Sequence, residues 1–251
     1  MKQIFNRFNR TYEINDDDIY WQKMMGKGIF QINNIRKLKE LKPKARTIID
    51  VGANIGTNTI EYATWADQVI SFEPTPELYK QLKRNIDLNK TNNDTVRWDK
   101  DTSMNLSANI NVHQVAVGEK CKQVYIKTFS NNKGKNHVTN EQTPDTVLVD
   151  VYPLDHFNFN DVDVIKIDVE GYELFVLQGA EQTIMKYRPV IQTELHQGLF
   201  KRQGITIQDV AEWFYQHNYY AIDKHGNKQP KILPTNHSGT DLFWIPNECV
   251  I

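Results

Sequence analysis

The sequence predicts an α/β fold built on a parallel β-sheet, and three features lead to this prediction. A mostly β-branched, apolar run at residues 47–51 fits a strand buried within a parallel sheet. The segment IIDVGANIG at 48–56 then provides a glycine turn that leads into a helical pattern, GTNTIEYATWA. A second strand at 68–72 ends in an acid, Glu73, about 20 residues beyond the turn. Together these segments predict a nucleotide-binding βαβ unit.

The glycine spacing of the turn distinguishes between nucleotide ligands. A dinucleotide fingerprint reads G-x-G-x-x-G, whereas Asn54 fills the middle position here and the pattern is D-x-G-x-N-x-G. A pyrophosphate is therefore disfavoured. S-adenosylmethionine carries an ammonium, a carboxylate and a ribose, for which Asp50, the positive end of the helix and Glu73 would each be a partner. The alternative is that Asp50 merely begins a loop and that Glu73 is a solvated acid at the end of a strand. It does not explain why both acids stand at the positions that a nucleotide-binding site requires.

Length and composition fit one α/β domain with insertions. The chain has 251 residues, and its 30 basic side chains nearly balance its 31 acidic ones, so no strong field favours nucleic acid or an anionic membrane. The opening MKQIFNRFNRTYEINDDD has no apolar core of signal-peptide length, and no apolar stretch approaches the roughly 20 residues of a membrane helix. Because Cys121 and Cys249 are the only cysteines, no disulfide framework is expected. These features predict a cytoplasmic protein with no membrane partner.

Two segments flank the βαβ unit. Residues 1–46 are predicted to form a helical preface, in which Asp16, Asp17 and Asp18 begin a helix and apolar residues at helical spacing continue it to position 41. After the second strand, a helix is expected over 74–89 and the third strand in NVHQVAVGE. Two alternating stretches, KQVYIKTF and DTVLVDVY, predict a β insertion at about 121–151. Insertions of this kind often meet substrates.

Acidic residues gather where the next strands end. A strand at 162–169, a helix at 172–187 and the strand VIQTEL follow the insertion. Lys166, Asp168 and Glu170 occupy alternate positions, which point to the same face of a strand. Burying such groups costs several kcal/mol each unless they are paired. We therefore expect Lys166 to be a buried partner of an acid. Glu170 and Glu173 are also explained as acids at a helix start. Glu194 and His196 stand near the same carboxyl edge, where α/β sheets bind ligands.

The chain resembles the FkbM-type family of S-adenosylmethionine-dependent methyltransferases. The resemblance lies in segments that cover most of residues 47–195: IIDVGANIG, VISFEPTPELYKQLKRNIDLN, HQVAVGE, LDHF, VIKIDVEGYELFVLQGA and RPVIQTEL. It implies a Rossmann-like class I methyltransferase fold, with a seven-stranded, mostly parallel sheet, helices on both faces and a β insertion before the fourth strand. The last strand would be antiparallel, built from YYAID and DLFWIP. The catalytic domain would then be residues 47–251.

The resemblance also implies an activity and site residues. The expected activity is methyl transfer to oxygen, on a hydroxyl of a carbohydrate or small molecule. Asp50, Gly52, Asn54, Gly56, Glu73 and Gln114 would bind the cofactor, with Gln114 next to the adenine. Methyl transfer from a sulfonium is an in-line displacement, so the enzyme holds the acceptor oxygen on the methyl axis and removes its proton. Asp168, Glu194 and His196 are the candidates for the base or for an acceptor clamp.

Three alternatives stay open. Asp168, Glu170, Glu194 and His196 could also bind Mg²⁺ or Mn²⁺, but only fold-level analogy supports a divalent metal, so we predict none. Methylation of nucleic acid is the second alternative, although no Asn/Asp-Pro-Pro-Tyr/Phe motif and no basic excess point to it. The third is a non-catalytic protein that binds S-adenosylmethionine. Oligomeric state is not predicted.

Overall fold

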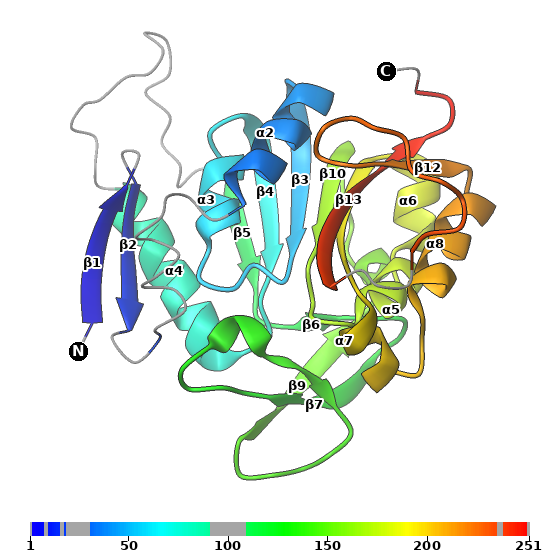
Figure 1. Cartoon of the computed structure of the whole chain (residues 1–251). Helices are drawn as coiled ribbons and strands as arrows, with labels where there is room; N and C mark the ends of the chain where they lie inside the picture. Colours follow the sequence, from blue (N-terminus) through cyan, green and yellow to red (C-terminus); the bar gives the residue numbers. More distant parts are fainter. Residues whose placement is uncertain are drawn as a thin grey trace, which may run out of the picture.

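A seven-stranded sheet forms the centre of the computed structural model, which describes residues 2–7, 10–15, 18, 31–90, 109–234 and 238–249. Its strands in chain order are β3 (Ala45–Val51), β4 (Ala66–Phe72), β5 (Ile110–His113), β10 (Val162–Ile167), β11 (Val190–His196), β12 (Tyr219–Ile222) and β13 (Ser238–Pro246). The spatial order is β12-β13-β11-β10-β3-β4-β5 (Figure 1). Neighbours from β11 to β5 run parallel, whereas β13 is antiparallel to both β11 and β12. The predicted sheet with an antiparallel last strand is confirmed.

Helices cover both faces of this sheet (Figure 1). On one face lie α2 (Ile32–Leu41), α3 (Thr57–Tyr62) and α4 (Pro76–Lys90); on the other lie α5 (Glu173–Gln178), α6 (Glu181–Tyr187) and α8 (Ile207–Gln216). Because successive side chains of a strand point to opposite faces, Ile48 packs with the first set of helices and Ile49 with the second. The sheet therefore separates two apolar cores and leaves its carboxyl edge between them.

The single helix expected over 172–187 is interrupted in the structure. A side chain at Gly179 would place its Cβ 1.9 Å from the carbonyl oxygen of Gly118, so the backbones approach closely there. The carbonyl of Gly179 accepts from the N–H of Asp155, and the carboxylate of Asp155 accepts from the N–H groups of Gln182 and Thr183 at 2.9 Å. These contacts end α5 and begin α6, which periodicity alone did not reveal. In the described ranges, no helix is long and apolar enough to cross a membrane.

A second, four-stranded sheet is built mostly from the predicted insertion, with one short strand from the segment NVHQVAVGE. Its strands are β6 (Ala116–Val117), β7 (Lys122–Lys127), β8 (His137–Thr139) and β9 (Thr146–Tyr152), in the order β6-β9-β7-β8. The short 3-10 helices η2 (Lys133–Lys135) and η3 (Leu154–His156) belong to the same region. Both alternating stretches are strands, as predicted. The segment NVHQVAVGE is divided, because its first part lies in the central sheet and Ala116–Val117 pairs with β9 instead.

The N-terminal segment differs from the helical preface that we expected. An N-terminal hairpin pairs β1 (Lys2–Arg7) with β2 (Arg10–Asn15), and α2 is the only helix described before β3. Amide side chains of α4 hold the open edge of β2: Asn85 Oδ1 accepts from the N–H of Glu13 at 2.7 Å, and Gln81 Nε2 donates to its carbonyl at 2.7 Å. Asp16 and Asp17 lie outside the described residues, and Asp18 is buried just beyond the hairpin. These edge contacts come from residues far apart in sequence.

Candidate active site

The glycine turn after β3 brings the ends of two neighbouring strands together. Gly52, Asn54 and Gly56 all have positive φ, of 80°, 52° and 90°. A Cβ on Gly52 would lie 1.9 Å from the carbonyl oxygen of Asp168, which follows β10. No side chain fits at that position, so the turn closes directly against the end of β10. A Cβ on Gly56 would lie 2.5 Å from Leu82 Cδ1, so this glycine serves the packing of α4 and does not line the cavity described below.

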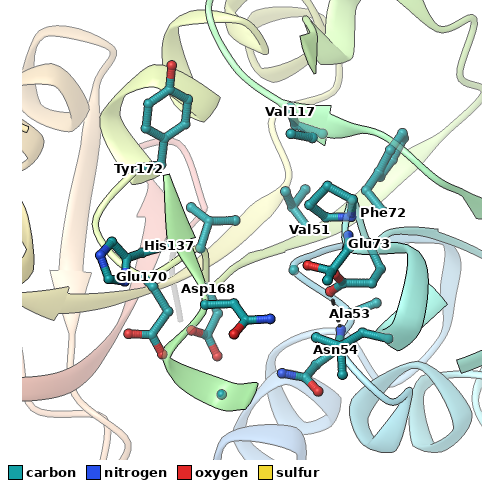
Figure 2. Close-up of a pocket in the computed structure, with 18 of the residues that line it drawn as sticks. Val51, Ala53, Asn54, Phe72, Glu73, Val117, His137, Asp168, Glu170 and Tyr172 are labelled. Atoms are coloured by element: carbon teal, nitrogen blue, oxygen red, sulfur yellow. Dashed lines mark hydrogen bonds between the residues drawn. The ribbon is translucent and has the colours of Figure 1, made fainter. Parts of the chain in front are cut away.

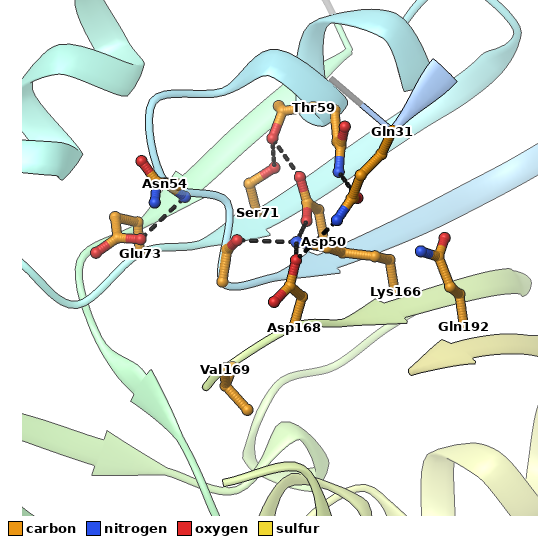
Figure 3. Close-up of polar contacts among 12 residues, drawn as sticks. Gln31, Asp50, Asn54, Thr59, Ser71, Glu73, Lys166, Asp168, Val169 and Gln192 are labelled. Carbon is orange, nitrogen blue, oxygen red and sulfur yellow. Dashed lines mark hydrogen bonds and ion pairs between the residues drawn. The ribbon is translucent and has the colours of Figure 1, made fainter. Parts of the chain in front are cut away.

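Glu73 is buried at the end of β4 and faces the glycine turn. Its carboxylate accepts a hydrogen bond from the backbone N–H of Asn54 at 2.9 Å (Figure 3). It accepts a second from the backbone N–H of Thr75, also at 2.9 Å. Burial raises the pKa of Glu73 to about 7, although hydrogen bonds from the backbone of Asn54 and from the backbone and side chain of Thr75 oppose this shift. A carboxylate can accept about four hydrogen bonds, so acceptor capacity is left for a ligand.

Asp50 lies beneath the cavity rather than in its wall. Its side chain is fully buried, with Oδ1 at 3.2 Å from Lys166 Nζ and Oδ2 accepting from Thr59 Oγ1 at 2.6 Å (Figure 3). Burial alone would lower the pKa of Lys166, but Asp50 and Asp168 outweigh it and raise that pKa. Lys166 is therefore the buried partner that we predicted. Asp50 is not among the residues that line the cavity, and its expected contact with a cofactor ammonium stays a prediction.

A cavity of about 1040 Å³, open mouth included, lies over the carboxyl edge of the central sheet (Figure 2). Of the predicted site residues it is lined by Gly52, Asn54, Glu73, Asp168 and Glu194. Gln114 is exposed and does not line it, whereas the apolar Val115 and Ala116 do; the expected contact of Gln114 with the adenine stays a prediction. His196, at the end of β11, is not among the lining residues either.

Three carboxylates meet at one end of this cavity. One oxygen each from Asp168, Glu170 and Glu194 lie within 4.8 Å of one another. Burial, followed by the neighbouring carboxylates, raises the pKa of Glu170 to about 8 and that of Glu194 to about 9. Glu173 is separate from this group in function, because its Oε1 accepts from the N–H of Val169 at 3.1 Å and closes the turn before α5. The convergence of acids predicted from strand ends is thus observed for Asp168, Glu170 and Glu194.

Residues of the insertion also line the cavity, and the sequence did not single them out. Lys133 is buried, with Nζ 2.8 Å from Glu77 Oε1. His137 lines the cavity together with Tyr172 and Glu170, and Figure 2 draws all three on the same side of the view. Its Nδ1 is 2.8 Å from the carbonyl oxygen of Lys135, and burial, with nearby cations, lowers its pKa. The insertion was predicted to meet a substrate, but no local spacing marks these side chains.

A family model for the methyltransferase FkbM domain matches residues 50–221. Over 173 residues, the chain is 29% identical to the hexuronic acid methyltransferase AglP of Haloferax volcanii. That match covers 66% of this chain and 62% of AglP, so the chain spans less than two thirds of that relative's length. The crystal structure of a methyltransferase FkbM from Methylobacillus flagellatus KT is similar in fold, with a TM-score of 0.53 and 20% identity over 80% of this chain and 43% of that chain.

Proposed function

Because the chain belongs to the FkbM family of methyltransferases, we propose that it transfers the methyl group of S-adenosylmethionine to a hydroxyl of a carbohydrate or another small molecule. The observation that carries this proposal is one cavity with two chemically different ends. Glu73 stands at one end, as a buried hydrogen-bond acceptor beside the glycine turn. Asp168, Glu170 and Glu194 stand at the other, as a group of acids suited to a cationic donor and to proton removal.

The donor would lie along the carboxyl edge of β3, β4 and β10. Glu73 has acceptor positions for the two ribose hydroxyls, and the turn from Gly52 to Asn54 lets a ligand approach the backbone. Asp168 is the lining acid nearest the buried Lys166, and we assign it to the ammonium of the methionine moiety in place of Asp50. The adenine would pack on apolar groups such as Phe72 and Val115.

The acceptor would enter between the acids and the insertion. Carboxylates accept hydrogen bonds from sugar hydroxyls, and the Tyr172 ring offers a face on which a sugar ring can pack. The relative AglP is named for hexuronic acid, which supports a carbohydrate as the class of acceptor. The absence of a basic excess gives no comparable support for nucleic acid.

Among the three candidate bases, the geometry favours Glu194. Asp168 is already assigned to the ammonium of the donor, and His196 does not line the cavity. Glu194 lines it, and its raised pKa makes its ionised form a stronger proton acceptor than an ordinary carboxylate. S-adenosylmethionine would supply an electrophilic methyl group on a sulfonium, with the thioether of S-adenosylhomocysteine as the leaving group. Glu194 would take the proton of the acceptor hydroxyl as its oxygen is methylated.

The affinity for S-adenosylmethionine is expected to rise as pH increases from about 6 to about 8. The pKa of Glu73 is raised to about 7, so its carboxylate is mostly protonated at about pH 6 and cannot accept hydrogen bonds from both ribose hydroxyls. If only the ionised form binds well, the affinity is about tenfold lower at about pH 6 than at about pH 8. Calorimetric titrations across this range measure the change; a flat profile for wild type and Glu73→Gln alike would contradict the role given to Glu73.

Methyl transfer is expected to survive chelation of divalent metals. The three carboxylates could coordinate Mg²⁺ with hard oxygen ligands. Their mutual repulsion would also be relieved without a metal, by a shared proton or by the cationic groups of the donor. We propose that no metal is bound. Protein dialysed against EDTA and assayed in metal-free buffer should keep its full rate, whereas a loss that added Mg²⁺ or Mn²⁺ restores would overturn the metal-free mechanism.

A methyl-transfer screen tests the proposed function as a whole. Purified protein is incubated with isotopically labelled S-adenosylmethionine and with sugars, uronic acids, glycolipids and RNA, and products are identified by mass shift. We expect label in a sugar or uronic acid hydroxyl. Label in RNA alone, or no binding of S-adenosylmethionine by calorimetry, would reject the proposal. We further propose that residues 47–251 form the catalytic domain and that the protein works in the cytoplasm.

A further inference from the structure

A residue outside the matched family domain reaches the donor end of the cavity. Gln31 precedes α2 and has a left-handed backbone with φ of 55°. The family match begins at residue 50, so this glutamine belongs to the N-terminal segment. Its side chain nevertheless lines the same cavity as Asn58 and Asp168. The part of the chain before β3 therefore contributes directly to the wall of the candidate site.

Both ends of the Gln31 amide have hydrogen-bond partners (Figure 3). Its Nε2 donates to Asp168 Oδ2 at 3.2 Å, and its Oε1 accepts from Asn58 Nδ2 at 2.8 Å. The amide thus spans from the start of α3 to the end of β10. Because donor and acceptor are both used, the side chain is held in one orientation, with its N–H group toward the acid.

The buried lysine cannot orient Asp168 by itself. Lys166 Nζ lies 2.9 Å from the carbonyl oxygen of Gly52 and 3.2 Å from Asp50, but 3.7 Å from Asp168 Oδ2. It therefore supplies charge to Asp168 from beyond hydrogen-bond distance. Gln31 supplies the directed hydrogen bond, and it does so to the same oxygen, Oδ2. Oδ1 is then the oxygen available to a ligand.

We propose that Gln31 is a positioning residue, which holds the Asp168 carboxylate toward the ammonium group of the methyl donor. This inference rests on the proposed function, because it assigns Asp168 to that ammonium. The effect of Gln31 is therefore confined to ligands that carry the amino acid moiety. Adenosine compounds without that moiety bind through Glu73 and the apolar wall and are insensitive to Gln31.

Calorimetry with two ligands tests this selectivity. S-adenosylhomocysteine carries the ammonium, whereas 5′-methylthioadenosine keeps the nucleoside and lacks the amino acid. Gln31→Ala should lower the affinity for S-adenosylhomocysteine by about tenfold, which corresponds to the loss of one hydrogen bond to a charged group. The affinity for 5′-methylthioadenosine should stay within about twofold of the wild-type value. Asn33→Ala is the matched control, since Asn33 lies two residues further along, in α2. Its amide is exposed and does not line this cavity. Equal losses for both ligands would mean a general structural role.

Gln31→Glu adds a readout that a structural role would not move. At about pH 8.5 the introduced carboxylate repels Asp168, whereas at about pH 5.5 a proton between the two acids restores a hydrogen bond. The affinity for S-adenosylhomocysteine relative to wild type should therefore fall by about tenfold or more between these pH values. A constant ratio overturns the inference while the proposed function stands. If wild-type protein binds neither ligand, both the inference and the proposed function fail.

Discussion

Glu73→Ala is expected to weaken the binding of S-adenosylmethionine by about 100-fold or more, the largest effect on the donor that any single change should produce. The carboxylate would accept hydrogen bonds from both ribose hydroxyls, each worth about 1.5 to 3 kcal/mol when the acceptor is charged, and each 1.4 kcal/mol is about tenfold in affinity. The change also leaves the N–H groups of Asn54 and Thr75 without their acceptor, which loosens the glycine turn. Isothermal calorimetry measures the loss.

Two controls separate lost binding from lost folding. Asp67→Ala removes an exposed acid from the amino end of the same strand, β4, and should bind the donor as wild type does. Thermal unfolding of Glu73→Ala should still be cooperative, with a midpoint lowered by the two unsatisfied backbone groups. If folded Glu73→Ala bound the donor within about threefold of wild type, the ribose contact would have to be assigned elsewhere.

Glu194→Gln is expected to lower kcat by about 100-fold to 10,000-fold while the affinity for S-adenosylmethionine changes little. A general base contributes this much, and glutamine keeps the size of the side chain but cannot take the proton. Because the pKa of Glu194 is raised to about 9, the wild-type rate should increase as pH rises toward that value. The variant should lack this limb of the profile. Steady-state rates across about pH 6 to 10 with a saturating acceptor measure both effects.

A neutral change at a distant acid completes this experiment. Glu141→Gln replaces an exposed carboxylate between β8 and β9 and should leave rate and pH profile unchanged. If Glu194→Gln had the same kcat and the same pH–rate profile as the wild type, Glu194 could not be the general base. Asp168 and His196 would then have to be tested in its place, each with donor binding measured separately.

Much of the fold could be predicted because its signals are local. The β-branched run of β3, the acid at the end of β4 and the alternation in β7 and β9 all lie within a few consecutive residues. The N-terminal hairpin could not, since the edge of β2 is satisfied by the amides of α4 more than 60 positions later. The break between α5 and α6 depends on Gly118 in the same way, because Gly179 lies against its carbonyl.

The residues of the candidate site likewise fall into those that the sequence could predict and those that depend on tertiary packing. The predicted acids Asp168 and Glu194 line one cavity because each stands at the carboxyl end of a parallel strand, which sequence order can reveal. Asp50 was expected in the same wall, but the register of β3 and β10 makes it the direct partner of Lys166. The spacing of residues along the sequence does not reveal which strand lies next to which. The histidine that reaches the cavity is His137 of the insertion rather than His196.

The sequence by itself determined the methyltransferase fold and the cradle that its glycine turn forms with Glu73. These depend on backbone freedom at Gly52 and on residues within one βαβ unit, so local chemistry is sufficient. Only the tertiary structure decided which polar atoms meet. Gln31 and Asp168 are 137 positions apart, and they touch because α2 packs against α3 and β11. Hydrophobic periodicity reports which face of an element is buried, but the partner of a polar side chain depends on how elements pack in three dimensions.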